Sequence, residues 1–220
     1  MVDLPQSVVS PSSPAAGEAG SGSARLWRVV AWAIGAGLAV GVLTNIGQGL
    51  LPGVWNQFVN SGAVWVVAAF VTGLLLPGRG RWTVIAGVGT QAGAVVGYYG
   101  YAELVRDGMG DLYAPAVWLA AALVAGPIFA TAGSWTRGDR RSRRVLGAAV
   151  LGGVFLMEAI RYQWVLEYTA EAGVFAALGL LLPLLPGRTG RDRWQSVLAA
   201  LPLGLVAFGV EQVLLAIVGL

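Results

Sequence analysis

The chain has 220 residues, of which 56% are hydrophobic and 11% charged, and its mean hydropathy is +0.71. A chain this apolar cannot close around one aqueous core and leave a wettable surface, so a lipid bilayer is its expected solvent. The net charge of +3 is carried by arginines in short loops, where anionic membrane lipids rather than nucleic acid are the expected partners.

The first 24 residues are rich in Ser, Pro, Ala and Gly. They contain neither the basic region nor the apolar core of a cleaved signal peptide, and they have too few large apolar residues to fold alone. We expect residues 1–24 to form a disordered cytoplasmic tail and residues 25–220 to form a transmembrane domain.

Seven apolar stretches follow this tail. A membrane-crossing helix needs about 20 apolar residues, and seven of them with short connections use nearly the whole chain. The predicted helices are residues 26–50, 62–77, 83–101, 115–135, 145–164, 172–186 and 195–217. The predicted fold class is therefore an all-α membrane protein with seven transmembrane helices.

The basic residues predict the orientation of these helices. All fourteen are arginine, and twelve of them lie before the first helix or after every second one. Short basic loops stay in the cytoplasm during insertion, so the N-terminus is predicted to be inside and the C-terminus outside the plasma membrane. The inner side then carries twelve arginines and four acids, a net charge of +8, and the outer side carries two arginines and seven acids, a net charge of −5.

Two patterns predict how the helices are arranged. The segment Leu74–Trp82 recurs loosely as Leu184–Trp194, and the turn at residues 133–138 has the same polarity, which predicts one helix followed by three parallel helical hairpins. Glycine stripes, at residues 37 and 41 and at residues 89, 93 and 97, predict close helix packing with the third helix in a central position.

The residue types exclude most enzyme chemistry. The chain has no Cys and no His, and all its basic residues are arginine, so it has no thiolate, no imidazole base or metal ligand, and no lysine for a retinal Schiff base. Every Asp falls in the tail or a loop, which argues against an intramembrane aspartyl protease, and there is no nucleotide-binding loop. We expect no enzymatic activity, no cofactor and no bound metal.

Few ionisable residues enter the predicted spans, where contact with lipid would be costly. Glu158 lies about 21 Å along the fifth helix from its inner end, and Arg161 and Tyr162 share its face. Other polar and aromatic residues occupy a similar depth on the second, third and seventh helices. The candidate ligand-binding residues are Glu158, Arg161, Tyr162, Tyr98, Tyr99, Asn60, Trp65 and Glu211.

These residues allow two interpretations. In the functional one, Glu158 and Arg161 bind a small polar or zwitterionic solute in an outward-facing pocket, ringed by Trp65, Tyr98 and Tyr99. In the structural one, Glu158 pairs with Arg161 within its own helix, Asn60 caps the second helix, and the tyrosines anchor the membrane interface. The tyrosines and Asn60 favour the structural interpretation, while Glu158 fits both equally.

Several short stretches form a recognisable set. They are Asn60-Ser61-Gly62 with Trp65, Gly97-Tyr98-Tyr99, Gly126-Pro127-Ile128-Phe129 and Glu158. Together they resemble a family of uncharacterised multi-pass membrane proteins found widely in actinobacteria. The resemblance implies a membrane location and a helical fold, without an activity, and it marks Asn60, Trp65, Tyr99 and Glu158 as positions to test.

Three functions are compatible with these observations. The first is a small-solute binding or transport protein that uses the outer polar residues. The second is a non-transporting membrane subunit that stabilises or regulates a partner protein, or a homo-oligomer, through its glycine faces. The third is the substrate-capturing subunit of a vitamin importer, with small residues at Ala31, Gly35 and Ala39, although such subunits usually have six spans with both ends inside.

Overall fold

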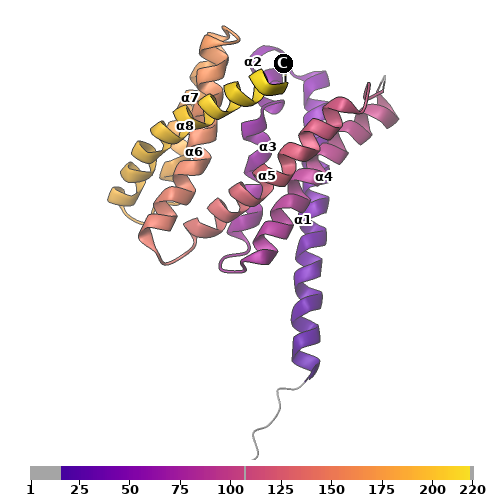
Figure 1. Ribbon diagram of the computed structural model, residues 1–220, viewed down its shortest axis with the longest axis vertical. Coiled ribbons are helices and arrows are strands. Elements are labelled where there is room, and N and C mark those ends of the chain that lie inside the picture. Colours follow the sequence, from indigo (N-terminus) through magenta and orange to yellow (C-terminus); the bar gives the residue numbers. More distant parts are fainter. Residues whose placement is uncertain (1–15, 107, 219–220) are drawn as a thin grey trace, which may run out of the picture.

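The computed structural model describes residues 16–106 and 108–218, and these are almost entirely helical, with no strand among them (Figure 1). The elements are α1 (Ala16–Leu50), α2 (Gly53–Val59), α3 (Gly62–Leu74), α4 (Arg81–Val105), α5 (Tyr113–Thr136), α6 (Arg141–Trp164), α7 (Thr169–Leu181), the 3₁₀ turn η1 (Leu182–Leu184) and α8 (Gly190–Val218). Each of the seven predicted helices has a counterpart, so the all-α prediction is confirmed.

Four helices are long and apolar enough to cross a membrane. They are Leu26–Leu50 of α1, the whole of α5 and α6, and Gly190–Leu214 of α8. The pair α2 and α3 reaches the same length and hydropathy together, but a 46° bend at their junction makes them a broken span or a re-entrant loop. The segment formed by α7 and η1 is apolar but shorter. These helices indicate that the protein associates with a membrane.

The two largest differences from the sequence prediction lie at the start of α1 and at α2. α1 begins at Ala16, within the segment predicted to be a disordered tail, and residues 1–15 of that tail lie outside the described residues. The short helix α2 occupies the connection between the first two predicted helices, after Pro52, whose extended backbone precedes the helix. No apolar stretch at α2 is long enough to predict a separate helix there.

Glycines bring α1 and α4 into backbone contact. A Cβ atom at Gly37 would lie 2.0 Å from the Thr90 carbonyl oxygen, and one at Gly41 would lie 2.0 Å from the Ala94 carbonyl oxygen. Only glycine fits so close an approach, and Gly97 of α4 faces α1 in the same way. The predicted packing role of these stripes is confirmed. Since both contacts advance together along the two helices, α1 and α4 run parallel.

Two further helix pairs are parallel by the same criterion. α6 and α8 are joined near their starts by Arg141 and Asp192, and near their far ends by Arg161 and Glu211. α3 and α5 are joined by the Trp65 and Trp118 rings, whose centroids are 6.0 Å apart. At their other ends, Leu74 of α3 lies against Gly133 of α5.

The arginine-bearing connections meet at one end of the molecule. The Arg188 guanidinium donates to the Arg137 carbonyl oxygen at 3.3 Å. Trp27 near the start of α1 lies edge-on to Trp82 at the start of α4, with centroids 5.1 Å apart. Figure 1 shows the start of α1 and the α3–α4, α5–α6 and α7–α8 turns toward the lower part of the view, with α2 and the α6–α7 loop at the opposite end.

The repeated sequence segment forms two different turns. In the first copy, Gly78 and Gly80 adopt positive φ values of 71° and 47°, a conformation that glycine reaches without strain. In the second copy, η1 extends α7, and Gly187 lies against the backbone of Arg193. Both copies connect two antiparallel helices, but by different backbone paths.

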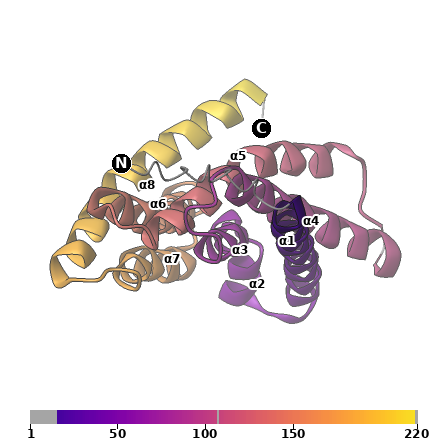
Figure 2. The ribbon, with the colours of Figure 1, turned by 90° about the horizontal axis from the view of Figure 1, so that it is seen from below.

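α3 lies between two groups of helices, which positions the polar residues at its N-terminus. Figure 2 shows α1, α4 and α5 on one side of α3 and α6, α7 and α8 on the other. The largest core cluster joins α3 to α5, α6 and α7 through residues that include Phe70, Phe129, Phe155 and Phe175. α3 therefore contacts the helices on both sides.

Candidate functional site

Glu158 of α6 is buried, with 2% of its surface exposed, and it lies at the N-terminus of α3. Its Oε1 atom accepts hydrogen bonds from the Ser61 hydroxyl at 3.0 Å and from the Ala63 N–H at 3.4 Å. Ser61 is the N-cap of α3, and its hydroxyl oxygen also accepts from the Ala63 N–H. Unpaired backbone N–H groups and the helix dipole favour a carboxylate at such a terminus.

Arg161 lies between Glu158 and Glu211 without a hydrogen bond to either. Its Nη1 atom is 3.6 Å from Glu158 Oε2, and its Nε atom is 3.6 Å from Glu211 Oε1. Both separations exceed the usual 2.7–3.2 Å of an N–H···O hydrogen bond. The Arg161 side chain is 36% exposed and the Glu211 side chain 24%. We call these three residues the outer ionic cluster, after the side of the membrane that the sequence predicts for them, and their formal charges sum to −1.

The outer ionic cluster holds buried polar atoms that lack partners. Among the described residues, Glu158 Oε2 and Glu211 Oε2 are buried and make no hydrogen bond, and neither does Nε2 of Gln212, the residue after Glu211. Most buried side-chain polar atoms in folded proteins have a hydrogen-bond partner, so an atom without one is unusual. Hydrogen-bonding groups on a bound solute would supply the missing partners.

The bend between α2 and α3 supplies the helix end that Glu158 contacts. Broken helices in transporters place the positive ends of half-helices at buried binding sites. Here the anionic group at that end is the carboxylate of Glu158 itself, held by Ser61 and Ala63. A solute at this cluster therefore meets a carboxylate and not a vacant helix N-terminus.

Tyr162 lies beside the cluster but is bound to other helices. Its ring stacks on Phe175 of α7, with centroids 5.0 Å apart and an interplanar angle of 17°. Its hydroxyl donates to the Gln57 side chain of α2 at 3.4 Å. These contacts attach α6 to α7 and α2, which gives Tyr162 a packing role.

Trp65, Tyr98 and Tyr99 form a separate aromatic cluster between α3, α4 and α5. The Tyr98 ring lies 5.4 Å from Trp65 and 5.0 Å from Tyr99, measured between centroids. Trp65 is 7% exposed, and its Nε1 atom has no hydrogen-bond partner among the described residues. Ser61 contacts Glu158 of α6, whereas the Trp65 ring contacts rings of α4 and α5. Among the described residues, no hydrogen bond, ion pair or ring contact joins these aromatic residues to the outer ionic cluster.

A second polar network joins α1 to α4, and the sequence did not predict its connections. Arg106 donates to the Asn45 side-chain oxygen at 2.9 Å, and the Asn45 amide donates to the Tyr98 carbonyl oxygen at 3.1 Å. The Tyr98 hydroxyl donates to the Gln48 side chain at 2.5 Å. The only signal in the sequence was the pair Asn45 and Gln48 at the end of the first predicted helix.

The residue that caps α3 is Ser61, and the interpretation that assigned this role to Asn60 is wrong. Asn60 is the C-cap of the preceding helix α2, where its backbone N–H donates to the Asn56 carbonyl oxygen. Serine is a preferred N-cap residue, and the apolar stretch begins directly after it. That pattern was the signal that would have identified Ser61.

A separate ionic group lies at the arginine-rich end of α6 and α8. Asp192 is 2% exposed, and it accepts from Arg141 Nε at 2.6 Å and from Arg144 Nη2 at 3.2 Å. The sequence predicted that these arginines determine the topology and contact anionic lipids. The structure shows that two of them also bind a buried carboxylate.

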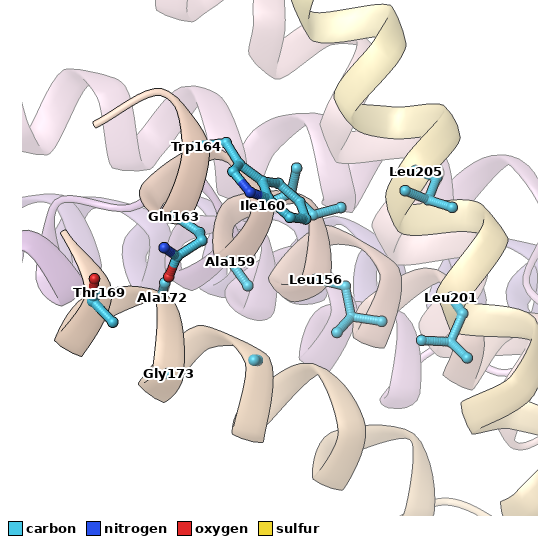
Figure 3. Close-up of a pocket in the computed structure, with 11 residues that line it drawn as sticks. Leu156, Ala159, Ile160, Gln163, Trp164, Thr169, Ala172, Gly173, Leu201 and Leu205 are labelled. Carbon is cyan, nitrogen blue, oxygen red and sulfur yellow. The ribbon is translucent and has the colours of Figure 1, made fainter. Parts of the chain in front are cut away.

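A cavity of about 470 Å³ lies on another face of α6, between α6, α7 and α8 (Figure 3). Its lining is mostly apolar and contains none of the charged residues of the outer ionic cluster. The lining residues are Leu156, Ala159, Ile160, Gln163, Trp164, Thr169, Ala172, Gly173, Ala176, Leu201 and Leu205. Within the described part of the chain, no group of three or more His, Cys, Asp or Glu side chains is placed to hold a metal ion.

Comparison with known proteins identifies the family. The model of a family of unknown function, DUF6518, matches residues 21–217. The chain belongs to this family. No curated protein and no solved structure matches it. Membership in DUF6518 agrees with the resemblance to an uncharacterised family. The family has no known function, so its membership identifies no site residue.

Proposed function

We propose that this member of DUF6518 is a seven-span plasma-membrane protein that binds a small polar solute at the outer ionic cluster. In this proposal the four long apolar helices are joined by three further crossings: α2 with α3, α4, and α7 with η1. The N-terminus is cytoplasmic and the C-terminus extracytoplasmic. The protein is not an enzyme, and solute movement would depend on a gradient or on another chain.

Helix direction supports this topology. If the seven crossings are numbered in chain order, the parallel pairs are the first with the third, the second with the fourth, and the fifth with the seventh. Each pair differs by two crossings, as alternating passage through a bilayer requires. The arginine-bearing connections meet at one end, which short basic loops would place in the cytoplasm.

One observation carries the solute-binding proposal. Glu158 is buried within a helix of membrane-spanning length, where a charged group is costly and its presence suggests a function. One of its oxygens is bound by Ser61 and Ala63, while the other has no hydrogen-bond partner among the described residues and lies 3.6 Å from Arg161. A purely structural carboxylate would be expected to use both oxygens.

The charge of the cluster suggests the class of solute. Two carboxylates and one guanidinium leave a formal charge of −1, so a group with a positive charge and N–H donors is favoured over an anion. An ammonium group would donate to the unpaired oxygens of Glu158 and Glu211. Amines and zwitterionic amino acids carry such a group.

Thermal unfolding of the purified full-length protein in detergent tests the proposal. The probes are methylammonium, the amino acid glycine and acetate, each added at increasing concentration. A ligand present at 100 times its Kd stabilises the folded state by about 2.7 kcal/mol, which raises the melting temperature of a chain of this size by several degrees. We expect this rise with methylammonium or glycine and none with acetate.

Two variants make the test specific to the cluster. Glu211→Gln removes a carboxylate that has no hydrogen bond to the N-terminus of α3, and it should abolish the response to the probes. Glu167→Gln changes an exposed acid in the α6–α7 loop and should leave the response unchanged. The proposal is contradicted if neither methylammonium nor glycine stabilises the wild-type protein, or if Glu211→Gln responds as the wild type does.

A second candidate function, as a non-transporting subunit of a membrane complex, is favoured by one surface. Ala31, Gly35 and Ala39 of α1 are exposed and form a stripe turned away from α4, and a Cβ at Gly35 would meet no atom within 4 Å. Such a stripe suits close approach by another helix. Under this function a stoichiometric partner co-purifies from native membranes, Gly35→Leu removes it, and no solute changes the melting temperature.

A further inference from the structure

The cavity between α6, α7 and α8 is a groove with three walls. α6 forms the back wall through Leu156, Ala159 and Ile160, and Figure 3 shows α7 and α8 on either side of it. Small residues of α7, at Ala172, Gly173 and Ala176, provide the space. Because α6 and α8 are both of membrane-spanning length, the groove lies at the depth of the hydrocarbon region.

The polarity of the groove changes along its length. The lining residues Leu156, Ala159 and Ile160 of α6 are apolar, and so are the facing leucines of α8, Leu201 and Leu205. The polar lining groups are Gln163 and Thr169, at the end where α6 passes into α7, and Trp164 lies beside them. Tryptophan prefers the membrane–water interface. The groove therefore matches an amphiphile that lies along the membrane normal with its polar end at the α6–α7 loop.

The groove has the size of a small-molecule site. Its volume of about 470 Å³ lies within the range of about 300–1,000 Å³ for such sites. From Leu156 to Trp164, α6 rises about 12 Å along the groove. A flexible hydrocarbon chain fits a groove of this volume with an apolar lining.

The charges around the polar end favour one class of headgroup. Residues 162–187, which contain the α6–α7 loop and all of α7, include Glu167 and Glu171 and no basic residue. The preceding Arg161 lies 3.6 Å from Glu158 and from Glu211, on another face of α6. Glu167 is exposed in the loop, and Glu171 lies in the first turn of α7, next to the lining residue Ala172. Two carboxylates would repel an anionic headgroup and attract an ammonium group.

We propose that this groove binds one acyl chain of a membrane lipid with a zwitterionic headgroup, which lies near Gln163 and Thr169. The inference rests on the membrane location in the proposed function but not on solute binding at the outer ionic cluster, since the two sites lie on different faces of α6. The lipid is a bound component of the folded protein and is retained more strongly than the lipids around the other helices.

The test uses the full-length protein in vesicles that contain phosphatidylethanolamine and phosphatidylglycerol. One of the two lipids carries a photoreactive diazirine on its acyl chain, and the labelled peptides are mapped by mass spectrometry. With the phosphatidylethanolamine probe we expect labelling to concentrate at residues 156–176 and 201–205. These residues should be labelled more strongly than the exposed faces of α1 and α5. The phosphatidylglycerol probe should label the groove less.

Two variants fill the groove from opposite walls. A Cβ at Gly173 would meet no atom within 4 Å, so Gly173→Leu occupies the groove without disturbing the fold. Leu205→Trp acts from α8, where Leu205 is 61% exposed. Each displaces several methylene groups of the chain and should lower groove labelling by about tenfold or more. Gly100→Leu, at another position where a Cβ meets no atom within 4 Å, should leave groove labelling unchanged.

The outcomes separate this inference from the proposed function. Groove labelling that is unchanged in both filling variants, or no stronger than on α1 and α5, overturns the lipid site. Equal labelling by the two probes overturns the headgroup preference. A change of oligomeric state in Gly173→Leu, measured by light scattering, shows that a second copy occupies the groove and also overturns the lipid site. No labelling of any helix by either probe instead contradicts the membrane location.

Discussion

α6 and α8 are held together by ionic contacts at both ends, and the two sets of contacts differ in quality. At the arginine-rich end, Asp192 accepts from two arginines, with a shortest distance of 2.6 Å. At the other end, Arg161 stands 3.6 Å from Glu158 and from Glu211, without a hydrogen bond. The same two helices and the same types of charge thus form one tightly bonded group and one loosely bonded group.

This difference supports the proposal that the outer ionic cluster is a binding site and that the Asp192 group is structural. Short charge-assisted hydrogen bonds are the strong ones, and those at Asp192 fix how α6 and α8 start beside each other. The outer ionic cluster keeps unpaired atoms on Glu158 and Glu211, so part of its hydrogen-bonding capacity is not used within the described chain. Substitutions at Asp192 should therefore affect stability, and substitutions at the cluster should affect binding.

The largest effect on stability is expected from Asp192→Asn. The amide cannot neutralise Arg141 and Arg144, and the Arg144 side chain, at 12% exposure, would be left without its counter-charge. We expect the melting temperature in detergent to fall further than it does for Ser61→Ala, Glu158→Gln or Glu211→Gln. The control is Asp139→Asn, an exposed acid at the same end, which should leave the melting temperature nearly unchanged. Equal effects of the two variants would show that the Asp192 contacts do not hold the helices.

Ser61→Ala should have the next largest effect. It removes the N-cap of α3 and one of the two hydrogen bonds to Glu158 Oε1. Loss of an N-cap costs about 1 kcal/mol, with a range of roughly 0.5–2 kcal/mol. Ser61→Thr keeps the hydroxyl and should restore most of the stability, measured by thermal unfolding. If Ser61→Ala unfolds at the wild-type temperature, Ser61 does not anchor the junction of α2 and α3.

Glu158→Gln should lower stability less than it lowers binding. The amide oxygen can still accept from Ser61 and Ala63, so we expect a loss of about 1 kcal/mol or less from the exchange of a charged for a neutral acceptor. The stabilisation by methylammonium or glycine should disappear. A large fall in membrane abundance together with retained stabilisation by the probes would assign Glu158 to structure alone.

Glu211→Gln should have the smallest effect on stability. Its contact with Arg161 is long and both side chains are partly exposed, so the pair contributes about 0–1 kcal/mol. Thermal unfolding without a probe should therefore resemble that of the wild type. A fall in melting temperature comparable to that of Asp192→Asn would mean that the two ionic groups hold α6 and α8 together equally strongly. It would contradict a loosely bonded outer ionic cluster.

The helices were predictable from the sequence because their signals are local. Apolar stretches of sufficient length predicted seven helices, and the spacing of Gly37 and Gly41 predicted the face that packs on α4. The boundaries at Ala16 and the separate helix α2 were missed, because no change of hydropathy marks either of them. Seven crossings with a cytoplasmic N-terminus remain a prediction.

The site was only partly predictable, because its contacts depend on tertiary structure. Glu158 and Arg161 are three residues apart on one helix, and helical spacing was enough to pair them. The contact of Arg161 with Glu211 and that of Glu158 with Ser61 join residues far apart in the chain. Depth in the membrane placed Tyr98 and Tyr99 at the level of Glu158, but depth does not specify which side of α3 a residue occupies.

The most direct test of the central claim is the accessibility of the outer ionic cluster from outside the cell. The chain has no Cys, so Arg161→Cys and Arg188→Cys each introduce a single thiol, one at the cluster and one at the arginine-rich end. In intact cells, a membrane-impermeant maleimide should label residue 161, more slowly when methylammonium is present, and should not label residue 188. Labelling of residue 188 from outside, or no labelling of residue 161, would contradict an outward-facing binding site at Glu158, Arg161 and Glu211.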